Sequence, residues 1–185
     1  MKFDSREQAE YEQAPAKVHP GRLVGIYDIG KQPGSVYEGK EIKPAYKLIF
    51  VYELLGKDRQ AKKEGQETGD TFKMSEFLTV SLHVKGTMQK RLQAFGAPLK
   101  KKSEDWYDID PKYNMSVMLG EPCMIEISHN EQGRAKVTGV TKPIDGLVVP
   151  DYTEKLAYLD LDSDDYLDHY NTAPQWIKDL VDKAI

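Results

Sequence analysis

The sequence predicts a mainly β fold in which one helix interrupts a series of five strands. Residues 77–84 alternate apolar and polar side chains, residues 45–55 are dense in aromatic and β-branched types, and residues 87–96 have helical spacing. The chain has 185 residues, a length that suits one domain with appended tails.

We expect three segments along the chain. Residues 1–19 lack periodicity and predict an N-terminal arm outside the core. Residues 20–146 hold the predicted strands and helix and form the folded domain. Residues 147–185 predict an acidic C-terminal tail that ends in a short amphipathic helix.

The first expected strand is RLVGIYDI, residues 22–29. Gly25 and Gly30 allow the bending that a strongly curved sheet needs. A loop rich in Gly, Pro and Lys follows and leads to the second strand.

The second expected strand, AYKLIFVYELL at residues 45–55, is apolar on both faces. Such a strand must be covered on both sides, by a core on one side and by a partner or a ligand on the other. Periodicity does not decide which face is the core. The two alternating sets are Tyr46, Leu48, Phe50, Tyr52 and Leu54 on one face and Ile49 and Val51 on the other.

A polar excursion over residues 56–75 predicts a long hairpin tip before the third strand. The third strand is expected at residues 77–84, because its side chains alternate cleanly. The inward set is Leu78, Val80, Leu82 and Val84.

A helix follows at residues 87–96, with Thr87 as the expected N-cap and Gly96 as the C-terminal stop. Its apolar stripe consists of Met88, Leu92 and Phe95. The last two strands form a hairpin, at residues 122–128 and 134–141, around a turn at residues 130–133.

Five strands with a helix between the third and the fourth is the element order of the OB-fold, a small Greek-key barrel. We therefore predict a five-stranded OB-fold barrel whose binding face lies over the second and third strands. Loops between strands 1 and 2 and between strands 4 and 5 would border that face. A five-stranded sheet with a helix on one side gives the same pattern and stays open as an alternative.

Several classes of protein have no support in the sequence. The N-terminus lacks the apolar segment of a secretory signal, and no stretch approaches the ~18 apolar residues of a membrane span. Cys123 is the single cysteine, which excludes an internal disulfide framework and a Cys-based zinc cluster. We expect a soluble, intracellular protein without metal or cofactor.

A nucleotide-binding enzyme is also disfavoured. Residues 34–40 match the first seven places of a phosphate-binding loop, but Glu41 stands where Ser or Thr would hold magnesium. The motif leads into a strand rather than a helix. We therefore expect no enzymatic activity.

The charge distribution is uneven. Residues 147–185 carry 9 Asp or Glu against 3 Lys or Arg, while the remaining residues carry 21 acidic and 23 basic side chains. Residues 85–102 contain six basic side chains and no acidic one. The asymmetry indicates a polyanion partner for the body and another role for the tail, although most charge runs are only solvated faces.

Aromatic residues alternate with lysines around the second strand. A protein surface that binds single-stranded nucleic acid needs this mixture. Bases stack on aromatic rings at roughly 1–3 kcal/mol each, and Lys and Arg follow the phosphates. Strand aromatics are also ordinary core residues, so each one has both interpretations. The candidate DNA-binding residues are Arg22, Tyr27, Lys40, Lys43, Tyr46, Lys47, Phe50, Tyr52, Phe77, Lys85, Lys90 and Arg91.

The tail combines an acidic run with a helix that begins at Pro174 and has an apolar stripe. The helix packs on the chain's own barrel or on a second copy, which would make a homo-oligomer. Alternatively, the tail competes with DNA for the basic groove or recruits replication partners. The candidate partner-binding residues are Asp160, Asp162, Asp164, Asp165, Tyr166 and Trp176.

The order of several segments resembles tailed-bacteriophage single-stranded DNA-binding proteins. These segments are GRLVGIYDIGKQ at residues 21–32, YKLIFVYEL at 46–54, SLHVKGTMQKRL at 81–92, LGEPC at 119–123 and PQWI at 174–177. The family often carries Trp on the second strand, where this chain has Ile49 and Tyr52.

The resemblance implies an OB-fold and sequence-independent binding of single-stranded DNA during phage DNA replication or recombination. It also implies action in the cytoplasm of a bacterial host, with phage replication or recombination proteins as partners of the tail. The alternative function is an OB-type module that binds a protein of a replication complex with little DNA contact.

Overall fold

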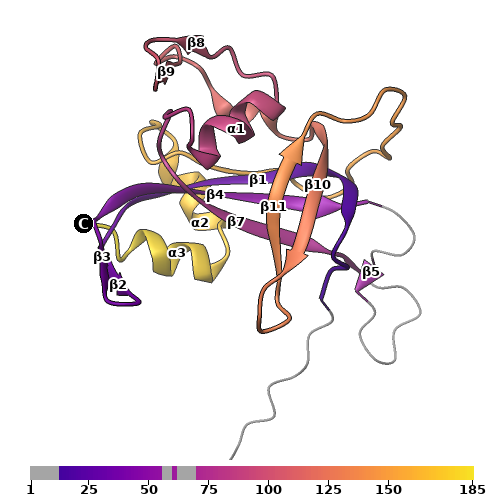
Figure 1. Ribbon diagram of the computed structural model, residues 1–185, viewed down its shortest axis with the longest axis horizontal. Coiled ribbons are helices and arrows are strands. Elements are labelled where there is room, and N and C mark those ends of the chain that lie inside the picture. Colours follow the sequence, from indigo (N-terminus) through magenta and orange to yellow (C-terminus); the bar gives the residue numbers. More distant parts are fainter. Residues whose placement is uncertain (1–12, 56–59, 62–69) are drawn as a thin grey trace, which may run out of the picture.

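The protein is a mainly β structure built on one large sheet (Figure 1). The computed structural model describes residues 13–55, 60–61 and 70–185. Most of the expected N-terminal arm and of the polar excursion at residues 56–75 lies outside the described residues. The mainly β class predicted from the sequence is confirmed.

Five strands make the main path of the sheet, and short elements connect them. The strands of the sheet are β1 (Val18–Gln32), β4 (Ala45–Leu54), β7 (Lys73–Thr79), β10 (Pro122–His129), β11 (Ala135–Thr141) and β12 (Ala157–Leu159). The short strand pairs are β2 (Ser35–Tyr37) with β3 (Lys40–Ile42), β5 (Gln60–Ala61) with β6 (Asp70–Thr71), and β8 (Lys100–Lys101) with β9 (Tyr107–Asp108). The helices are α1 (Thr87–Ala94), α2 (Tyr166–Thr172) and α3 (Gln175–Val181), with the 3₁₀ turn η2 (Met115–Met118).

The long strand β1 organises the sheet. The order along the main path is β11-β10-β1-β4-β7, and every neighbouring pair on this path is antiparallel. One edge of β1 pairs with β4. The other edge of β1 pairs with β10 at residues 18–22 and with β12, in parallel, at residues 25–27. The two ends of the path, β7 and β11, also contact each other.

The third strand differs from its prediction. The sequence pattern predicted residues 77–84, whereas β7 covers Lys73–Thr79. The backbone N–H of Val80 donates the last bond, to the carbonyl oxygen of Tyr46, and the chain then leaves the sheet to reach α1. Val80 is 46% exposed, so its inward assignment is wrong. Beyond the strand, Leu82 packs against the larger core, while the backbones of Leu82 and Val84 bond to residues 105–107 instead of to the sheet.

The helix prediction is largely confirmed. Met88 and Leu92 are buried on one stripe, as their spacing requires. The helix ends before Gly96, whose φ of +73° is a left-handed conformation that favours glycine. The N-cap is Gly86 in an extended conformation rather than Thr87.

Two hydrophobic cores lie on opposite faces of β4, which explains why this strand is apolar on both sides. Leu48, Phe50 and Tyr52 point into the larger core, which α1 also covers. Ile49 points into a second, smaller core together with Leu159 and Ile177. Figure 1 shows α1 above the sheet and α3 below it.

The tail helix therefore packs on the chain's own sheet. Ile177 of α3 is fully buried against the outward face of β1 and β4. Of the alternatives left open by the sequence, docking on the same chain is confirmed. The cover that β4 needs on its second face is supplied by residues more than a hundred positions away.

Replacing Ile177 by Ala should destabilise the protein by about 2–5 kcal/mol, because it leaves a cavity between α3 and the sheet. Urea unfolding of the full chain measures this loss. The matched control is Leu167→Ala on α2, where an exposed side chain should change stability by less than about 0.5 kcal/mol. Equal stabilities of the two variants would contradict the packing of α3 on the sheet.

Candidate nucleic-acid interface

The structure buries five side chains that the sequence assigned to DNA contact. Each is at most 7% exposed. Stacking needs an accessible ring, and a phosphate contact needs an accessible guanidinium, so these five assignments are wrong. The buried residues are Arg22, Tyr27, Phe50, Tyr52 and Arg91.

Arg91 has a structural partner in Glu76. Its Nη2 donates to Glu76 Oε1 at 2.6 Å and its Nε donates to Glu76 Oε2 at 2.9 Å. The hydroxyl of Tyr52 donates to the same Oε2 at 3.0 Å. The bidentate pair satisfies a buried carboxylate and joins α1 to β7, so Arg91 is not available to a phosphate.

Arg22 is held in a similar way on the outward face. Its Nε lies 3.1 Å from Glu53 Oε2, and its guanidinium lies over the Tyr152 ring, 5.5 Å from the centroid. Tyr27 packs in the second core, where burial raises the pKa of its hydroxyl. Phe50 lies in the larger core beside Tyr52.

The other seven candidates remain accessible. They come from the β2–β3 hairpin, the start of β4, β7 and the region of α1. Lys47 is half-buried and the others are exposed. These residues are Lys40, Lys43, Tyr46, Lys47, Phe77, Lys85 and Lys90.

The β2–β3 hairpin is built by a tight two-residue turn. Glu38 and Gly39 both have positive φ, 49° and 74°, as the hairpin turn that matches the strand twist requires. Lys40 and Lys43 are exposed in this region, and so are Glu38 and Glu41. The hairpin therefore has mixed charge rather than a purely basic surface.

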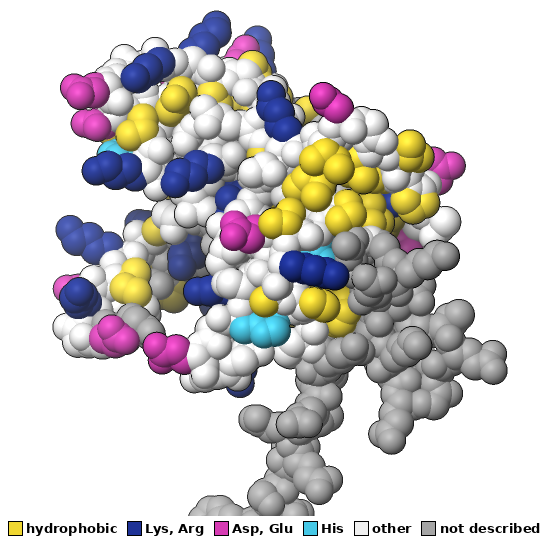
Figure 2. Space-filling model, turned by 45° about the vertical axis from the view of Figure 1, so that its right-hand side comes forward, with side chains coloured by type: hydrophobic (Ala, Val, Ile, Leu, Met, Phe, Trp, Pro, Cys, Tyr) yellow, Lys and Arg dark blue, Asp and Glu magenta, His cyan; other side chains and the backbone are white. Residues whose placement is uncertain are grey.

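Figure 2 shows Lys and Arg side chains gathered around a hollow on the left of the view. The hollow lies between the part of the molecule with α1 and the β8–β9 hairpin and the part with the β2–β3 hairpin. Both parts carry exposed lysines, including Lys85, Lys90 and Lys40. The rim of this hollow is therefore one place where a polyanion would meet positive side chains.

The accessible aromatic side chains lie on different faces of the sheet. Phe77 pairs with Ile49, and Lys47 pairs with Thr79, so Phe77 and Lys47 share the outward face. Phe77 is 55% exposed there. Tyr46 belongs to the opposite face, that of Leu48, and is exposed at the end of the strand.

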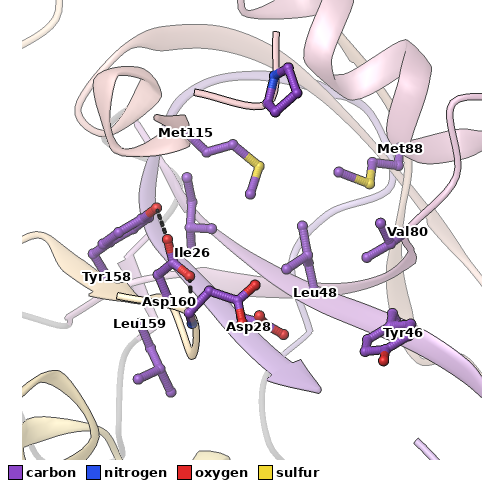
Figure 3. A pocket seen from close by; sticks show the side chains of 12 residues that line it. Ile26, Asp28, Tyr46, Leu48, Val80, Met88, Met115, Tyr158, Leu159 and Asp160 are labelled. Carbon is purple, nitrogen blue, oxygen red and sulfur yellow. Dashed lines mark hydrogen bonds between the residues drawn. The ribbon is translucent and has the colours of Figure 1, made fainter. Parts of the chain in front are cut away.

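The pocket beside Tyr46 has an acidic wall. Its volume is about 350 Å³, and Figure 3 shows Asp28 and Asp160 across it from Met88 and Met115. Burial raises the pKa of the Asp28 carboxyl, and Asp160 and Asp162 raise it further. A phosphate would meet carboxylates here, so a polynucleotide backbone fits the outward face better than this pocket.

The acidic residues of the tail are mostly accessible. Asp160 is half-buried, and its carboxylate accepts from the Asp162 N–H at 3.0 Å and from the Tyr158 hydroxyl at 3.3 Å (Figure 3). The other candidate tail residues, Asp162, Asp164, Asp165, Tyr166 and Trp176, are exposed. Their partner-binding role stays a prediction.

The sequence pattern did not show that Trp176 lies against the outward face of the sheet. It placed Trp176 on a partner-binding tail, whereas the structure puts this side chain beside β1 and β4. Lys73 and Tyr152 on the same face were not identified at all. Two features of the sequence pointed to this packing. The second strand is apolar on both faces and needs a second cover, and the tail helix has an apolar stripe that needs a surface to pack on.

The chain matches no protein-family model and no curated protein. Within the described ranges, no helix has the length and hydrophobicity needed to cross a membrane. In the same residues, no group of three or more His, Cys, Asp and Glu side chains is placed to hold a metal ion.

Replacing Arg91 by Ala should destabilise the protein by about 3–5 kcal/mol, because it leaves the Glu76 carboxylate buried without its partner. Chemical unfolding followed by circular dichroism measures the effect. The neighbouring exposed Lys90 provides the control, since Lys90→Ala should change stability by less than about 0.5 kcal/mol. An unchanged stability of the Arg91 variant would show that the ion pair with Glu76 is absent in solution.

Proposed function

We propose that the protein is an OB-fold protein that binds single-stranded DNA without sequence preference. The proposal places the DNA on the outward face of β7 and the adjoining end of β4. Phe77 supplies a stacking surface there, and Lys47 supplies a positive charge.

The strand pairing supports the OB-fold assignment. If β1, β4, β7, β10 and β11 are the five barrel strands, the first pairs with the second and the fourth, the second with the third, and the fourth with the fifth. Helix α1 lies between the third and the fourth of them in the chain. The contact between β7 and β11 is the one expected where a barrel closes.

The observation that carries the function is the exposed ring of Phe77. On the outward face of this sheet, the neighbouring apolar side chains Ile49 and Tyr27 are covered by the tail, but Phe77 is left in solvent. Every base has a π-face, so an exposed ring beside lysines binds single strands with little dependence on sequence.

The surrounding lysines complete the electrostatic part of the proposal. Lys40 and Lys43 are exposed on and next to the β2–β3 hairpin, and Lys85 and Lys90 are exposed on the α1 side of the sheet, where a strand that continues past the edge of β7 would meet them. Contacts between these side chains and phosphates release counterions, so the affinity should fall steeply with salt. Tyr46 lies at the end of β4 on the opposite face, and its ring would stack with a base of a DNA strand that passes from one face to the other.

The biological setting follows from the resemblance described above. Phage DNA replication or recombination exposes single strands that need a protein cover, and this takes place in the cytoplasm of the bacterial host. A binding surface made of stacking rings and cations suits that task, because it accepts any base order.

Replacing Phe77 by Ala should weaken binding to oligothymidylate by about 1–3 kcal/mol, the range for losing one base stack. Fluorescence anisotropy with a labelled oligonucleotide at low ionic strength measures the affinity. Tyr166→Ala is the control, since it removes an exposed aromatic on α2, away from β4 and β7. If the full protein bound no oligothymidylate at low ionic strength, a protein-binding module would be the better interpretation.

Replacing Lys47 by Ala should reduce the salt dependence of binding. Each phosphate contact on a single strand contributes about 0.7 to the slope of log affinity against log salt concentration, and the variant should lose about one such contact. A titration series at several salt concentrations gives the slope. An unchanged slope would place the phosphate path away from Lys47.

A further inference from the structure

A second aromatic and cationic site lies on the same face of the sheet, between the sheet and the tail. It is a pocket of about 310 Å³, at the small end of the range of ligand pockets. Its floor is formed by β1 and β4, one wall by β7, another by residues 152–157 and the last by the start of α3.

The floor of the pocket is closely packed around Gly25, which has no side chain. A Cβ at this position would lie 3.1 Å from Tyr27 Cε2 and 3.2 Å from Val51 Cβ. Both distances are shorter than ordinary van der Waals contact, so only glycine lets Tyr27 and Val51 lie this close to the β1 backbone. Val51 and Tyr27 supply apolar and aromatic surface beside it.

Trp176 of α3 forms an exposed aromatic wall. Its neighbour Ile177 is fully buried and holds the helix on the sheet, while Trp176 is 42% exposed. Pro174 and Ala157 line the same side. The indole is thus positioned by a buried anchor but keeps part of its surface free for a planar group.

The opposite wall is polar and carries two lysines and the carboxylate of Glu154. Lys73 and Ser75 come from β7, and Lys155 comes from the segment before β12. Tyr152 also lines the pocket, and the Arg22 guanidinium lies over its ring.

Lys73 pairs with Glu154 in an exposed ion pair. Exposed pairs contribute only about 0–1 kcal/mol, so a phosphate can compete for the Lys73 ammonium.

We propose that this pocket binds one nucleobase of the single-stranded DNA, stacked on Trp176, with its phosphate near Lys73 and Lys155. The inference rests on the proposed function and extends it. Ser75 lies between Lys73 and Phe77 on the same face of β7, so the pocket continues the surface on which Phe77 lies. In this proposal the C-terminal tail contributes Trp176 and Lys155 to the DNA site of its own chain.

The chain has two tryptophans, and this allows a direct test. In the full-length variant Trp106→Phe, the remaining tryptophan fluorescence comes from Trp176. Oligothymidylate should quench this fluorescence, and the quenching should saturate at the same DNA concentration as the anisotropy of a labelled oligonucleotide.

Affinity measurements complete the test. Trp176→Ala should weaken binding by roughly 5- to 150-fold, as expected for the loss of one base stack, while Trp176→Phe should retain most of the affinity. The Phe variant also keeps an apolar ring on α3, so its result does not depend on a loosened tail. Trp106→Phe, on the β8–β9 hairpin side, should bind as the unmodified protein does.

Two outcomes overturn the inference, and they differ. Normal DNA binding with neither quenching nor an effect of Trp176→Ala would remove the nucleobase pocket and leave the proposed function standing. Absence of DNA binding by the unmodified protein at low ionic strength would remove the proposed function itself.

Discussion

The packing of apolar side chains on both faces of β4 determines the rest of the structure. Leu48, Phe50, Tyr52 and Leu54 fill the core beneath α1, and Ile49 on the other face needs a cover of its own. That cover comes from β12 and α3, with Ile177 buried at the contact. Burying an aliphatic side chain of this size contributes about 1.5–3 kcal/mol, so the tail is held by ordinary hydrophobic packing.

This arrangement decides which groups remain for function. The tail covers the outward face over β1 and β4 but leaves β7 open, so Phe77 and the residues beside it stay accessible. It also brings an indole and a lysine from the C-terminal part of the chain to the same face. Under the proposed function, the tail would be a part of the binding surface as well as a structural cover.

The sequence predicted the fold better than the site, and the reason is physical. Alternation and spacing are local, so β4, α1 and the β10–β11 hairpin were found within a few residues. Whether a given aromatic or arginine is buried depends on distant partners. Glu76 bonds to Arg91 and Tyr52, and α3 packs in the same core as Tyr27. Neither contact can be predicted from the local periodicity of the sequence. Phe77 was identified correctly as outward-facing, because it lies on a strand with a single buried face.

Photochemical crosslinking tests most directly whether DNA lies on the outward face. The full protein would be irradiated in complex with an oligonucleotide that carries bromodeoxyuridine, and the linked peptides would be identified by mass spectrometry. We predict crosslinks in Lys73–Thr79 of β7 and at Trp176 of α3. Crosslinks confined to the β8–β9 hairpin and Trp106 would contradict the account, because they would place the DNA away from the face that the tail and β7 share.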